Sequence, residues 1–431
     1  MSNLILNFGR CSHGKCIFCG YGRIRGQKPD ETDVNRCFDD FFDTVKDEEV
    51  KIYGSGSFFD EKQMPKTSRK HFIKKCVETG VKKITLESRP EYVTAEVLSE
   101  FRDFELTVAV GLETSDNSLL EKLEKGYTRE DFETAADLIH DAGQKVRAYL
   151  LVNPPYVKDP VKSLDDSVEY ALTKSDSIVL INTIPHSSAP LMRLWLEGRW
   201  NFMDKREFGA TTKKWVQNPK VEVDFETFKF KPNIPEYLRG NLKGVGEWYL
   251  THPHFEVWQD YFVRWYQPPK DRILIFLPCS YKKPYSLSET HKGIVNTLGS
   301  ERAKFHEVML SNAGVIPREF EDYYPFNSYD WDEKLENETI KRRYIEVTTQ
   351  RIEKYLAPHI QSYRGIVCFL KYGSESYKAL DAACKNMNTG FKNLLSKETY
   401  DKIQNERKPL QTNEALKELR DGIKWCLQNS T

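Results

Sequence analysis

The first 200 residues alternate between short apolar runs and amphipathic stretches, and this alternation constrains the fold more than any other feature of the sequence. Helical patterns such as 69–80 and 129–143 separate the apolar runs. A repeated strand–helix–strand order predicts a parallel sheet with right-handed crossovers. The chain is too short here for a closed eight-stranded barrel, so we expect an α/β fold with a partial (β/α)6 barrel. The six expected strands are 2–8, 50–56, 82–88, 106–113, 145–152 and 176–183.

A second domain is expected because 431 residues exceed one typical domain. Residues 201–245 are polar, irregular and contain three prolines, so they are predicted to connect a domain at 1–200 to one at 246–431. Beyond them the α/β pattern returns, which predicts a Rossmann-like α/β domain with a helical tail from about residue 375. Its expected elements are a helix at 251–266 and strands at 271–278, 304–311 and 364–373.

Composition narrows the function. Lys+Arg and Asp+Glu both number 64, so the net charge is zero. This argues against a protein that binds nucleic acid non-specifically over its whole surface, but it allows a local RNA-binding patch. Candidates for such a patch are Lys213, Lys214, Arg342 and Arg343, whose alternative is a solvated surface. The chain has no apolar run of membrane-spanning length and no secretory signal, so we expect a cytoplasmic protein with no membrane partner.

Three of the nine cysteines lie within nine residues, which is typical of a metal site in a reducing compartment. Cys11, Cys16 and Cys19 form C-x4-C-x2-C directly after the first expected strand. Three thiolates on one loop can hold three corners of a [4Fe–4S] cluster and leave one iron open. The alternatives are unrelated thiols or a zinc site, in which His13 would be the fourth ligand. If the cluster interpretation holds, we expect the three thiols to converge.

Polar and glycine-rich segments follow the next expected strands: KIYGSGSFFD, ITLESRPEYVT, VAVGLETSDNSLLEKLEKGYT and KVRAYLLVNPPY. They are expected at the carboxyl ends of parallel strands, where α/β folds bind ligands. Each has a simpler explanation, namely a tight turn for the glycines, a solvated strand end for each glutamate and a surface cation for each arginine.

Together with the cysteines, these motifs resemble the radical S-adenosylmethionine (SAM) superfamily, in particular the branch of elongator acetyltransferase subunit 3 and the archaeosine-forming lyases. The usual cysteine spacing in that family is one residue shorter. The resemblance implies a [4Fe–4S] cluster on the three cysteines, SAM as the second cofactor, an external electron donor, and reductive cleavage of SAM to a 5′-deoxyadenosyl radical. The residues it implies for cofactor binding are Phe18, Gly54, Ser55, Gly56, Ser57, Glu87, Arg89, Glu113 and Arg147.

A second group of reactive side chains lies in PCSYKKPYSLSETH, directly after the strand expected at 271–278. A thiol, a lysine, hydroxyls and a histidine within fourteen residues can form a nucleophile, a base and anion-binding donors. The alternative is a strand-to-helix turn with a buried cysteine, in which Ser288 caps the helix. The residues concerned are Cys279, Ser280, Lys283, Tyr285, Ser288 and His291.

This loop resembles the signature of the archaeosine synthase core domain, a family that adds the lysine side-chain amine to the nitrile of 7-cyano-7-deazaguanine (preQ0) in tRNA. The resemblance implies a chain that fuses this domain to the radical SAM lyase, with lysine and tRNA as substrates. Cys279 would form a thioimidate, assisted by Ser280, Lys283 and His291. Substrate would be bound by Tyr285, Ser288, Arg318, Glu319, Tyr329 and Asp330.

The RNA-binding PUA domain of archaeosine synthases is not recognisable here, so a separate RNA-binding subunit is one expectation. A free deazapurine, DNA or another nucleic-acid base remain alternative substrates, and a non-catalytic Fe–S scaffold of a tRNA-modifying complex is an alternative function.

Overall fold

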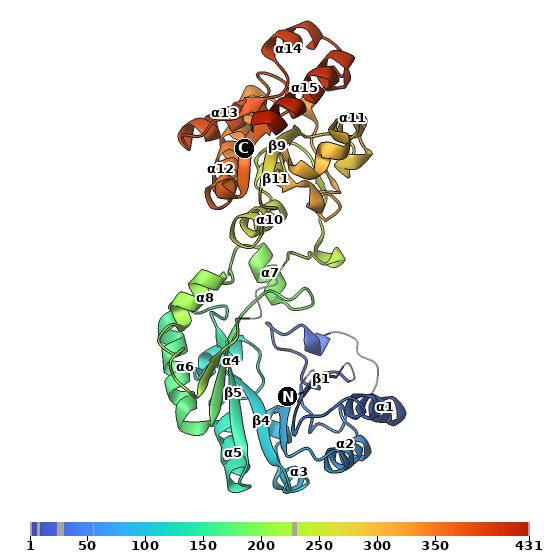
Figure 1. Cartoon of the computed structure of the whole chain (residues 1–431). Coiled ribbons are helices and arrows are strands. Elements are labelled where there is room, and N and C mark those ends of the chain that lie inside the picture. Colours follow the sequence, from blue (N-terminus) through green and yellow to red (C-terminus); the bar gives the residue numbers. More distant parts are fainter. Residues whose placement is uncertain (1, 7–8, 24–29, 55, 226–230, 430–431) are drawn as a thin grey trace. The chain divides into compact units, whose positions relative to one another are not determined.

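The computed structural model describes residues 2–6, 9–23, 30–54, 56–225 and 231–429. The chain divides into two units, Met1–Phe230 and Lys231–Thr431 (Figure 1). None of the helices in these described ranges is long and apolar enough to cross a membrane. Asn7, Phe8 and Ser55, which belong to expected strands, lie outside the described residues.

The sheet of the first unit confirms the predicted partial barrel. It has seven parallel strands that follow one another in chain order and curl into a half-barrel (Figure 1). Six of them match the expected strands. The strands are β1 (Ser2–Ile5), β2 (Glu49–Tyr53), β3 (Lys83–Ser88), β4 (Glu105–Glu113), β5 (Lys145–Val152), β6 (Ser177–Asn182) and β7 (Val221–Val223).

Helices connect these strands and cover the sheet. Helix α5 begins with a capping box formed by Thr128 and Asp131, and its apolar residues pack into the same core as the strands. Helix α8 and strand β7 belong to the first unit and lie inside the segment predicted as a connector. The helices are α1 (Glu31–Phe42), α2 (Lys66–Glu78), α3 (Ala95–Ser99), α4 (Asn117–Lys122), α5 (Arg129–Asp141), α6 (Pro160–Lys174), α7 (Leu191–Leu196) and α8 (Lys205–Thr212).

The second unit contains a five-stranded sheet in the order β11-β10-β9-β13-β14. This is the Rossmann order 3-2-1-4-5, with one departure, because β10 and β11 form an antiparallel hairpin at one edge. A separate two-stranded sheet pairs β8 with β12. The strands are β8 (Leu242–Lys243), β9 (Arg272–Pro278), β10 (Phe305–Ser311), β11 (Gly314–Pro317), β12 (Tyr329–Asp330), β13 (Tyr363–Cys368) and β14 (Lys392–Asn393).

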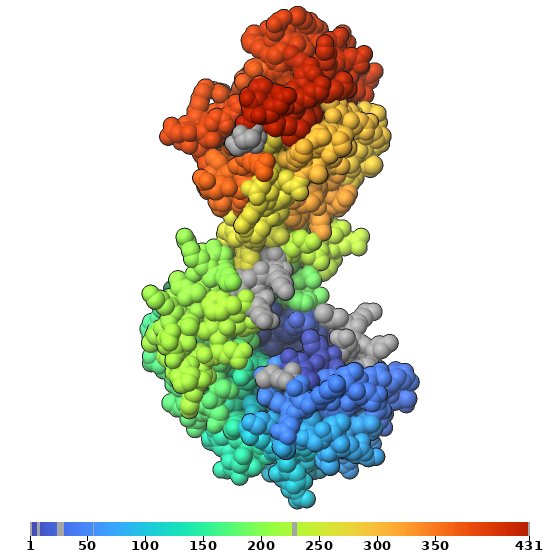
Figure 2. Space-filling model, in the orientation of Figure 1, coloured from blue at the N-terminus to red at the C-terminus, as the bar shows by residue number. Residues whose placement is uncertain are grey.

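Strand β9 is buried along most of its length. Its neighbours are β10, the next strand of this sheet in the chain, on one side and β13, which comes later in the chain, on the other. The carboxyl end of β9 is therefore the topological switch point of this sheet, where α/β folds bind ligands. Figure 2 shows helix α15, coloured dark red, at the outer surface of this unit. The helices are α9 (Glu247–Leu250), α10 (Pro253–Arg264), α11 (Glu289–Leu298), α12 (Glu338–His359), α13 (Glu375–Asn386), α14 (Lys397–Ile403) and α15 (Asn413–Asn429).

Candidate active sites

The loop with the three cysteines is anchored by an apolar residue between the second and third thiols. Ile17 is buried in a small cluster with Leu119, Leu123 and Leu191. Its N–H donates to the carbonyl of Leu123 at 3.1 Å, and its own carbonyl accepts from the N–H of Leu191 at 2.9 Å. The loop is thus fixed between the segments that follow β4 and β6, at the carboxyl end of the half-barrel.

The donor set and its surroundings suit a cluster, although the thiols do not converge. Among the described residues no three His, Cys, Asp or Glu side chains are grouped as a metal site. The expected convergence is therefore not present in this conformation. Thiols do not attract one another, and the spacing of such ligands is set by what they bind. The kind and number of the donors, three thiols on one loop, are those that an iron–sulfur cluster uses.

Close backbone packing explains the glycines around Cys11. A Cβ atom at Gly56, whose φ is +125°, would lie 2.9 Å from the Cβ of Cys11 and 2.7 Å from Gln63 Oε1. A Cβ at Gly22 would lie 3.3 Å from the same Cys11 atom. The turn after β2 therefore lies directly against the cysteine loop, as the resemblance implied for a SAM-binding glycine motif.

Glu87, at the carboxyl end of β3, faces this turn. Its Oε2 accepts a hydrogen bond of 3.0 Å from the N–H of Gly54, and both residues line a small cavity of about 20 Å³. Burial raises the pKa of Glu87 to about 7, although the Gly54 N–H and Tyr149 oppose the shift. Ser57 continues the turn, with its N–H bonded to Gln63 Oε1 at 2.6 Å and its hydroxyl 2.7 Å from that of Ser88.

Glu113 and Lys125 form a buried ion pair at the end of β4. Lys125 Nζ lies 2.6 Å from Glu113 Oε1, and each side chain is 8% exposed. Burial alone would lower the pKa of Lys125, but Glu113, Tyr127 and Cys16 together outweigh it and raise that pKa. Glu113 has a φ of +67°, at a shift of register between β4 and β5. A buried pair at a strained position is costly to break, by about 3–5 kcal/mol.

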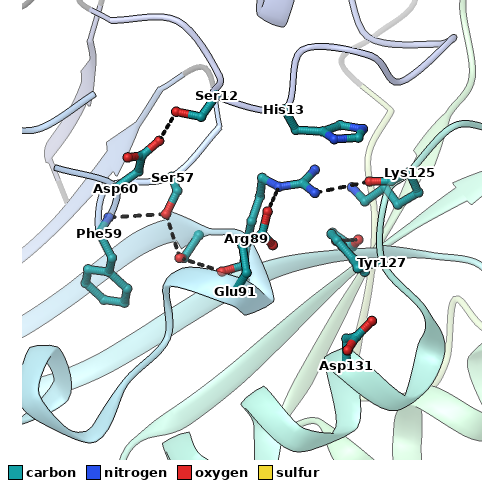
Figure 3. A network of polar contacts seen from close by, with 12 residues as sticks. Ser12, His13, Ser57, Phe59, Asp60, Arg89, Glu91, Lys125, Tyr127 and Asp131 are labelled. Atoms are coloured by element: carbon teal, nitrogen blue, oxygen red, sulfur yellow. Dashed lines mark hydrogen bonds and ion pairs between the residues drawn. The ribbon is translucent and has the colours of Figure 1, made fainter. Parts of the chain in front are cut away.

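Arg89 and Tyr127 extend this cluster beneath the cysteine loop (Figure 3). The Arg89 guanidinium lies 4.8 Å from the centre of the Tyr127 ring and donates to the Lys125 carbonyl at 3.2 Å. Lys125 Nζ lies 5.7 Å from the centre of the Phe18 ring, which places the aromatic residue of the cysteine loop over the same group. Both cations already pair with carboxylates, Arg89 with Glu91 and Lys125 with Glu113. Lys125 and Tyr127 were not singled out from the sequence, because a lysine after a short helix carries no distinctive pattern.

The expectation that Arg147 lies at a carboxyl end was wrong. It is the third residue of β5, near the amino end of the strand, and its guanidinium pairs with Glu222 of β7. This pair bridges two strands and lies away from the loops that follow the carboxyl ends. By contrast, Glu87, Arg89 and Glu113 lie where the sequence placed them.

In the second unit, the loop after β9 opens into a cavity of about 970 Å³. Cys279 Sγ lies 3.5 Å from the hydroxyl of Tyr329, which also contacts the hydroxyl of Tyr285. Lys283 Nζ lies 4.0 Å from the centre of the Tyr329 ring. Cys279, Ser280, Lys283 and Asp330 line the cavity, so the structure brings these predicted residues together.

Burial keeps both phenols protonated. It raises the pKa values of Tyr285 and Tyr329 well above the usual range, and negative charge on Cys279 would raise them further. Each is therefore a hydrogen-bond donor rather than a base. Tyr329 reaches the thiol from β12, fifty residues along the chain.

His291 and Arg318 lie behind the loop, not in the cavity. His291 Nε2 donates to the Pro278 carbonyl at 2.9 Å, and Arg318 Nη2 donates to Nδ1 at 2.7 Å. Burial, with the Arg318 charge, lowers the pKa of His291 to about 3. Ser288 caps helix α11 by accepting from the N–H of His291 at 3.2 Å. These residues therefore fix the end of β9 and the start of α11.

Glu319 belongs to a different network from its neighbour Arg318. Its carboxylate accepts from Tyr266 and lies 3.4 Å from His306 Nε2. His306 and Tyr363 are the second and first residues of their strands, so this network lies at the amino end of the sheet, opposite the Cys279 loop.

Several residues of the cavity wall were not predicted, because they come from segments distant in sequence. Glu336 accepts from Trp331 Nε1 at 2.5 Å. Burial raises the pKa of Glu336, and the nearby carboxylates of Glu375 and Glu333 raise it further. Wall residues beyond the predicted ones include Tyr281, Asn312, Trp331, Glu333, Glu336, Lys341, Tyr344, Lys371, Glu375, Arg407 and Lys408.

Comparison with known proteins gives two family matches, one in each unit. Residues 6–168 match the Radical SAM superfamily, and residues 256–419 match a domain of unknown function, DUF5591. A [4Fe–4S] cluster and SAM are the cofactors that the first family implies.

Relatives named as subunits of archaeosine synthase each match about a third of this chain. An archaeosine synthase subunit beta from Methanosarcina acetivorans is 34% identical over 35% of this chain and 46% of its own length. An archaeosine synthase subunit alpha from the same organism is 28% identical over 34% of this chain and 23% of its own length. The chain spans about half the length of the first relatives it matches. A queuine lyase from Clostridium spiroforme is 18% identical, with a TM-score of 0.41, over 52% of this chain and 90% of its own.

Proposed function

We propose that this chain, in which a radical SAM domain precedes a DUF5591 domain, takes part in the formation of archaeosine in tRNA. In the second unit the side-chain amine of lysine would add to the nitrile of preQ0. The first unit would then cleave the C–N bond of the lysine adduct and leave the formamidine. Matches to relatives named archaeosine synthase subunit alpha and subunit beta support both halves of this proposal.

One observation carries the proposal: at the switch point of the second sheet, Cys279 and Lys283 line a large cavity, and both contact the buried Tyr329, Cys279 at its hydroxyl and Lys283 over its ring. A nitrile is electrophilic at carbon and basic at nitrogen. A nucleophile and a donor placed side by side therefore suit addition across the C≡N bond.

The addition balances without a redox partner. The sulfur of Cys279 bonds to the nitrile carbon while a proton goes to the nitrile nitrogen, which gives a thioimidate. The neutral amine of lysine then attacks the same carbon and the thiol leaves with a proton, so the product is an N-substituted amidine. Tyr329, which stays protonated, is the donor nearest the sulfur, and the Lys283 charge stabilises negative charge that develops beside it.

The cavity wall also supplies groups for free lysine. Asp330, Glu336 and Glu375 present carboxylates, which bind ammonium groups, and Lys371 presents a cation for the α-carboxylate. In this proposal His291, Arg318 and Ser288 position the loop rather than bind substrate, because their polar atoms bond to one another and to the end of β9. Tyr285 orients Tyr329 through its hydroxyl contact.

In the first unit, Cys11, Cys16 and Cys19 would hold the [4Fe–4S] cluster, which, when loaded and reduced by an external donor, supplies the electron that cleaves SAM. The backbone at Gly54 and Gly56 and the carboxyl of Glu87 would bind the methionine end of SAM. Arg89, whose guanidinium has donors beyond the one that pairs with Glu91, would contact its carboxylate.

Mass spectrometry of preQ0-containing tRNA, incubated anaerobically with the reconstituted enzyme and lysine, tests both steps. Without SAM the base should gain the mass of one lysine, and with SAM and a reductant it should become the formamidine. Cys279→Ala should stop lysine addition and leave SAM cleavage intact, whereas the control Cys37→Ala should leave both activities intact. A lysine adduct formed by the Cys279→Ala enzyme would exclude the thioimidate. Parallel reactions with free preQ0 and with preQ0-containing DNA identify the substrate class.

A further inference from the structure

An exposed tyrosine stands at the rim of the second unit's cavity. Tyr281 is 82% exposed, more than any other large apolar or aromatic residue described as exposed, and yet it lines the cavity two residues from Cys279. A tyrosine ring left in water gains nothing for folding, since burying an aromatic side chain is worth several times the thermal energy. Its place on the cavity wall, rather than its exposure alone, makes this ring a candidate contact for a ligand.

Hydrogen bonds within the loop fix the backbone at Tyr281. Lys283 Nζ donates to the carbonyls of Ser280 at 2.8 Å and of Tyr281 at 3.4 Å. The Ser280 hydroxyl donates to the Lys282 carbonyl at 2.9 Å. Because the carbonyls of Ser280, Tyr281 and Lys282 all accept hydrogen bonds, little backbone freedom of this loop is left to lose on binding.

Exposed cations lie beside Tyr281 in sequence or on the same cavity wall: Lys282 is the next residue, and Arg407 and Lys408 line the cavity. In the part of the chain that the structure describes, no ion pair involves Lys282, Arg407 or Lys408, all of which are exposed. Gln411 Nε2 donates to Thr290 Oγ1 at 2.8 Å and so ties the segment of Arg407 and Lys408 to the helix that follows the Cys279 loop. Lys292 is the main cause of the lowered pKa of Glu289, and the charges of Lys408 and Lys282 lower it further. Lys408 and Lys282 therefore both lie near Glu289.

We propose that Tyr281, Lys282, Arg407 and Lys408, here called the Tyr281 rim, bind an unstacked nucleotide of RNA that neighbours the reacting one. The base of this nucleotide would stack on Tyr281 while the three cations contact the adjoining phosphates. This inference rests on the proposed function, and it assigns the nucleic-acid contact to the same domain as the lysine chemistry. A free base has no phosphates to use these cations, so the rim selects a polynucleotide.

The Tyr281 rim would also explain how a chain without net positive charge binds RNA. With a net charge of zero, the chain has no overall field to hold RNA, so affinity has to come from a local patch. An exposed aromatic ring interleaved with cations is the arrangement by which proteins bind unpaired nucleotides with little preference for sequence.

Fluorescence anisotropy of the full chain with unmodified tRNA, without lysine, tests the rim independently of the chemistry. Tyr281→Ala should weaken binding about 5- to 100-fold, while Tyr281→Trp should retain it. The control is Tyr237→Ala, which removes a ring that is 71% exposed but does not line the cavity. Because Tyr281 is exposed, its removal should leave the fold unchanged, as circular dichroism can verify.

Salt dependence gives the second readout. The double variant Arg407→Gln, Lys408→Gln should reduce the slope of log affinity against log salt concentration by about 1.4 to 1.8, the effect of two lost phosphate contacts. The matched control is Lys417→Gln, Arg420→Gln, which removes two exposed cations from α15 that do not line the cavity.

Binding by the Tyr281→Ala chain equal to that of the unaltered chain, or equal losses in the rim and control variants, would overturn the inference. Failure of the proposed function would look different. In that case no substrate would gain lysine, but Tyr281→Ala would still weaken tRNA binding.

Discussion

Arg318 Nη2 donates a 2.7 Å hydrogen bond to Nδ1 of His291, and the opposite ring nitrogen donates to the carbonyl at the end of β9. The imidazole is thereby held neutral and in one tautomer, beside a fixed guanidinium. The histidine nearest the candidate nucleophile is thus part of the support of the loop rather than a proton carrier.

His291 should accordingly not titrate between pH 5 and 8. Its imidazole resonances, followed by NMR over that range, should stay constant, because burial and Arg318 hold its pKa at about 3. His291→Ala should destabilise the second unit by about 2–5 kcal/mol, since it leaves a cavity and an unpaired buried donor. Lys292→Ala, on the exposed side of the same helix, is the control for urea unfolding. A midpoint near pH 6.5 would contradict the assignment.

Glu87 should make the stability of the first unit depend on pH. Its pKa is raised to about 7 in the folded chain, so the native state binds more protons than the unfolded state between about pH 4.5 and 7. The free energy of unfolding should therefore fall as pH rises through this window, by up to about 3 kcal/mol. Glu87→Gln, which keeps an acceptor for Gly54, should remove this dependence, whereas the exposed-site variant Glu78→Gln should retain it. Equal pH dependence in Glu87→Gln and the unaltered chain would refute the shift.

The three clustered cysteines should determine iron content. Anaerobic reconstitution of the full chain should give about four irons per chain. Cys11→Ala, Cys16→Ala and Cys19→Ala should each lower both iron content and SAM cleavage, while Cys37→Ala, in the same unit, should change neither. Zinc binding without deoxyadenosine release would instead favour the zinc alternative.

Glu375 should contribute to lysine affinity. Its carboxylate lies near that of Glu336 on the cavity wall. Glu375→Gln, which removes the charge, should raise the KM for lysine about tenfold or more, with a smaller effect on kcat. Glu414→Gln, an exposed change on α15, serves as the control in steady-state assays with preQ0-containing tRNA. A kcat loss with unchanged KM would place Glu375 in the chemistry instead.

The sequence predicted six strands of the first sheet and β9, β10 and β13 of the second, because each is an apolar run bounded by polar or glycine residues. It did not predict β7, β11 or β14, which are short. It also predicted that the loop at the end of β9 carries reactive side chains, because they directly follow an apolar strand. It misplaced Arg147 because that residue's partner, Glu222, lies on a strand within a segment that looked like a connector. Arg318 and Glu319 are adjacent in sequence, and only the fold shows that they enter separate networks. Tyr329 was named, but its contact with Cys279 depends on a two-residue strand that no periodicity reveals.

The first sheet has two end strands, β1 and β7, that pair with one neighbour each in the described part of the chain. A closed ring of strands admits a guest only along its axis, and its interior is filled with side chains. A ring that stops short of closure also has a flank. In the proposed function, a base still attached to a bulky polymer would approach the carboxyl-end loops from that side, without being threaded through the top.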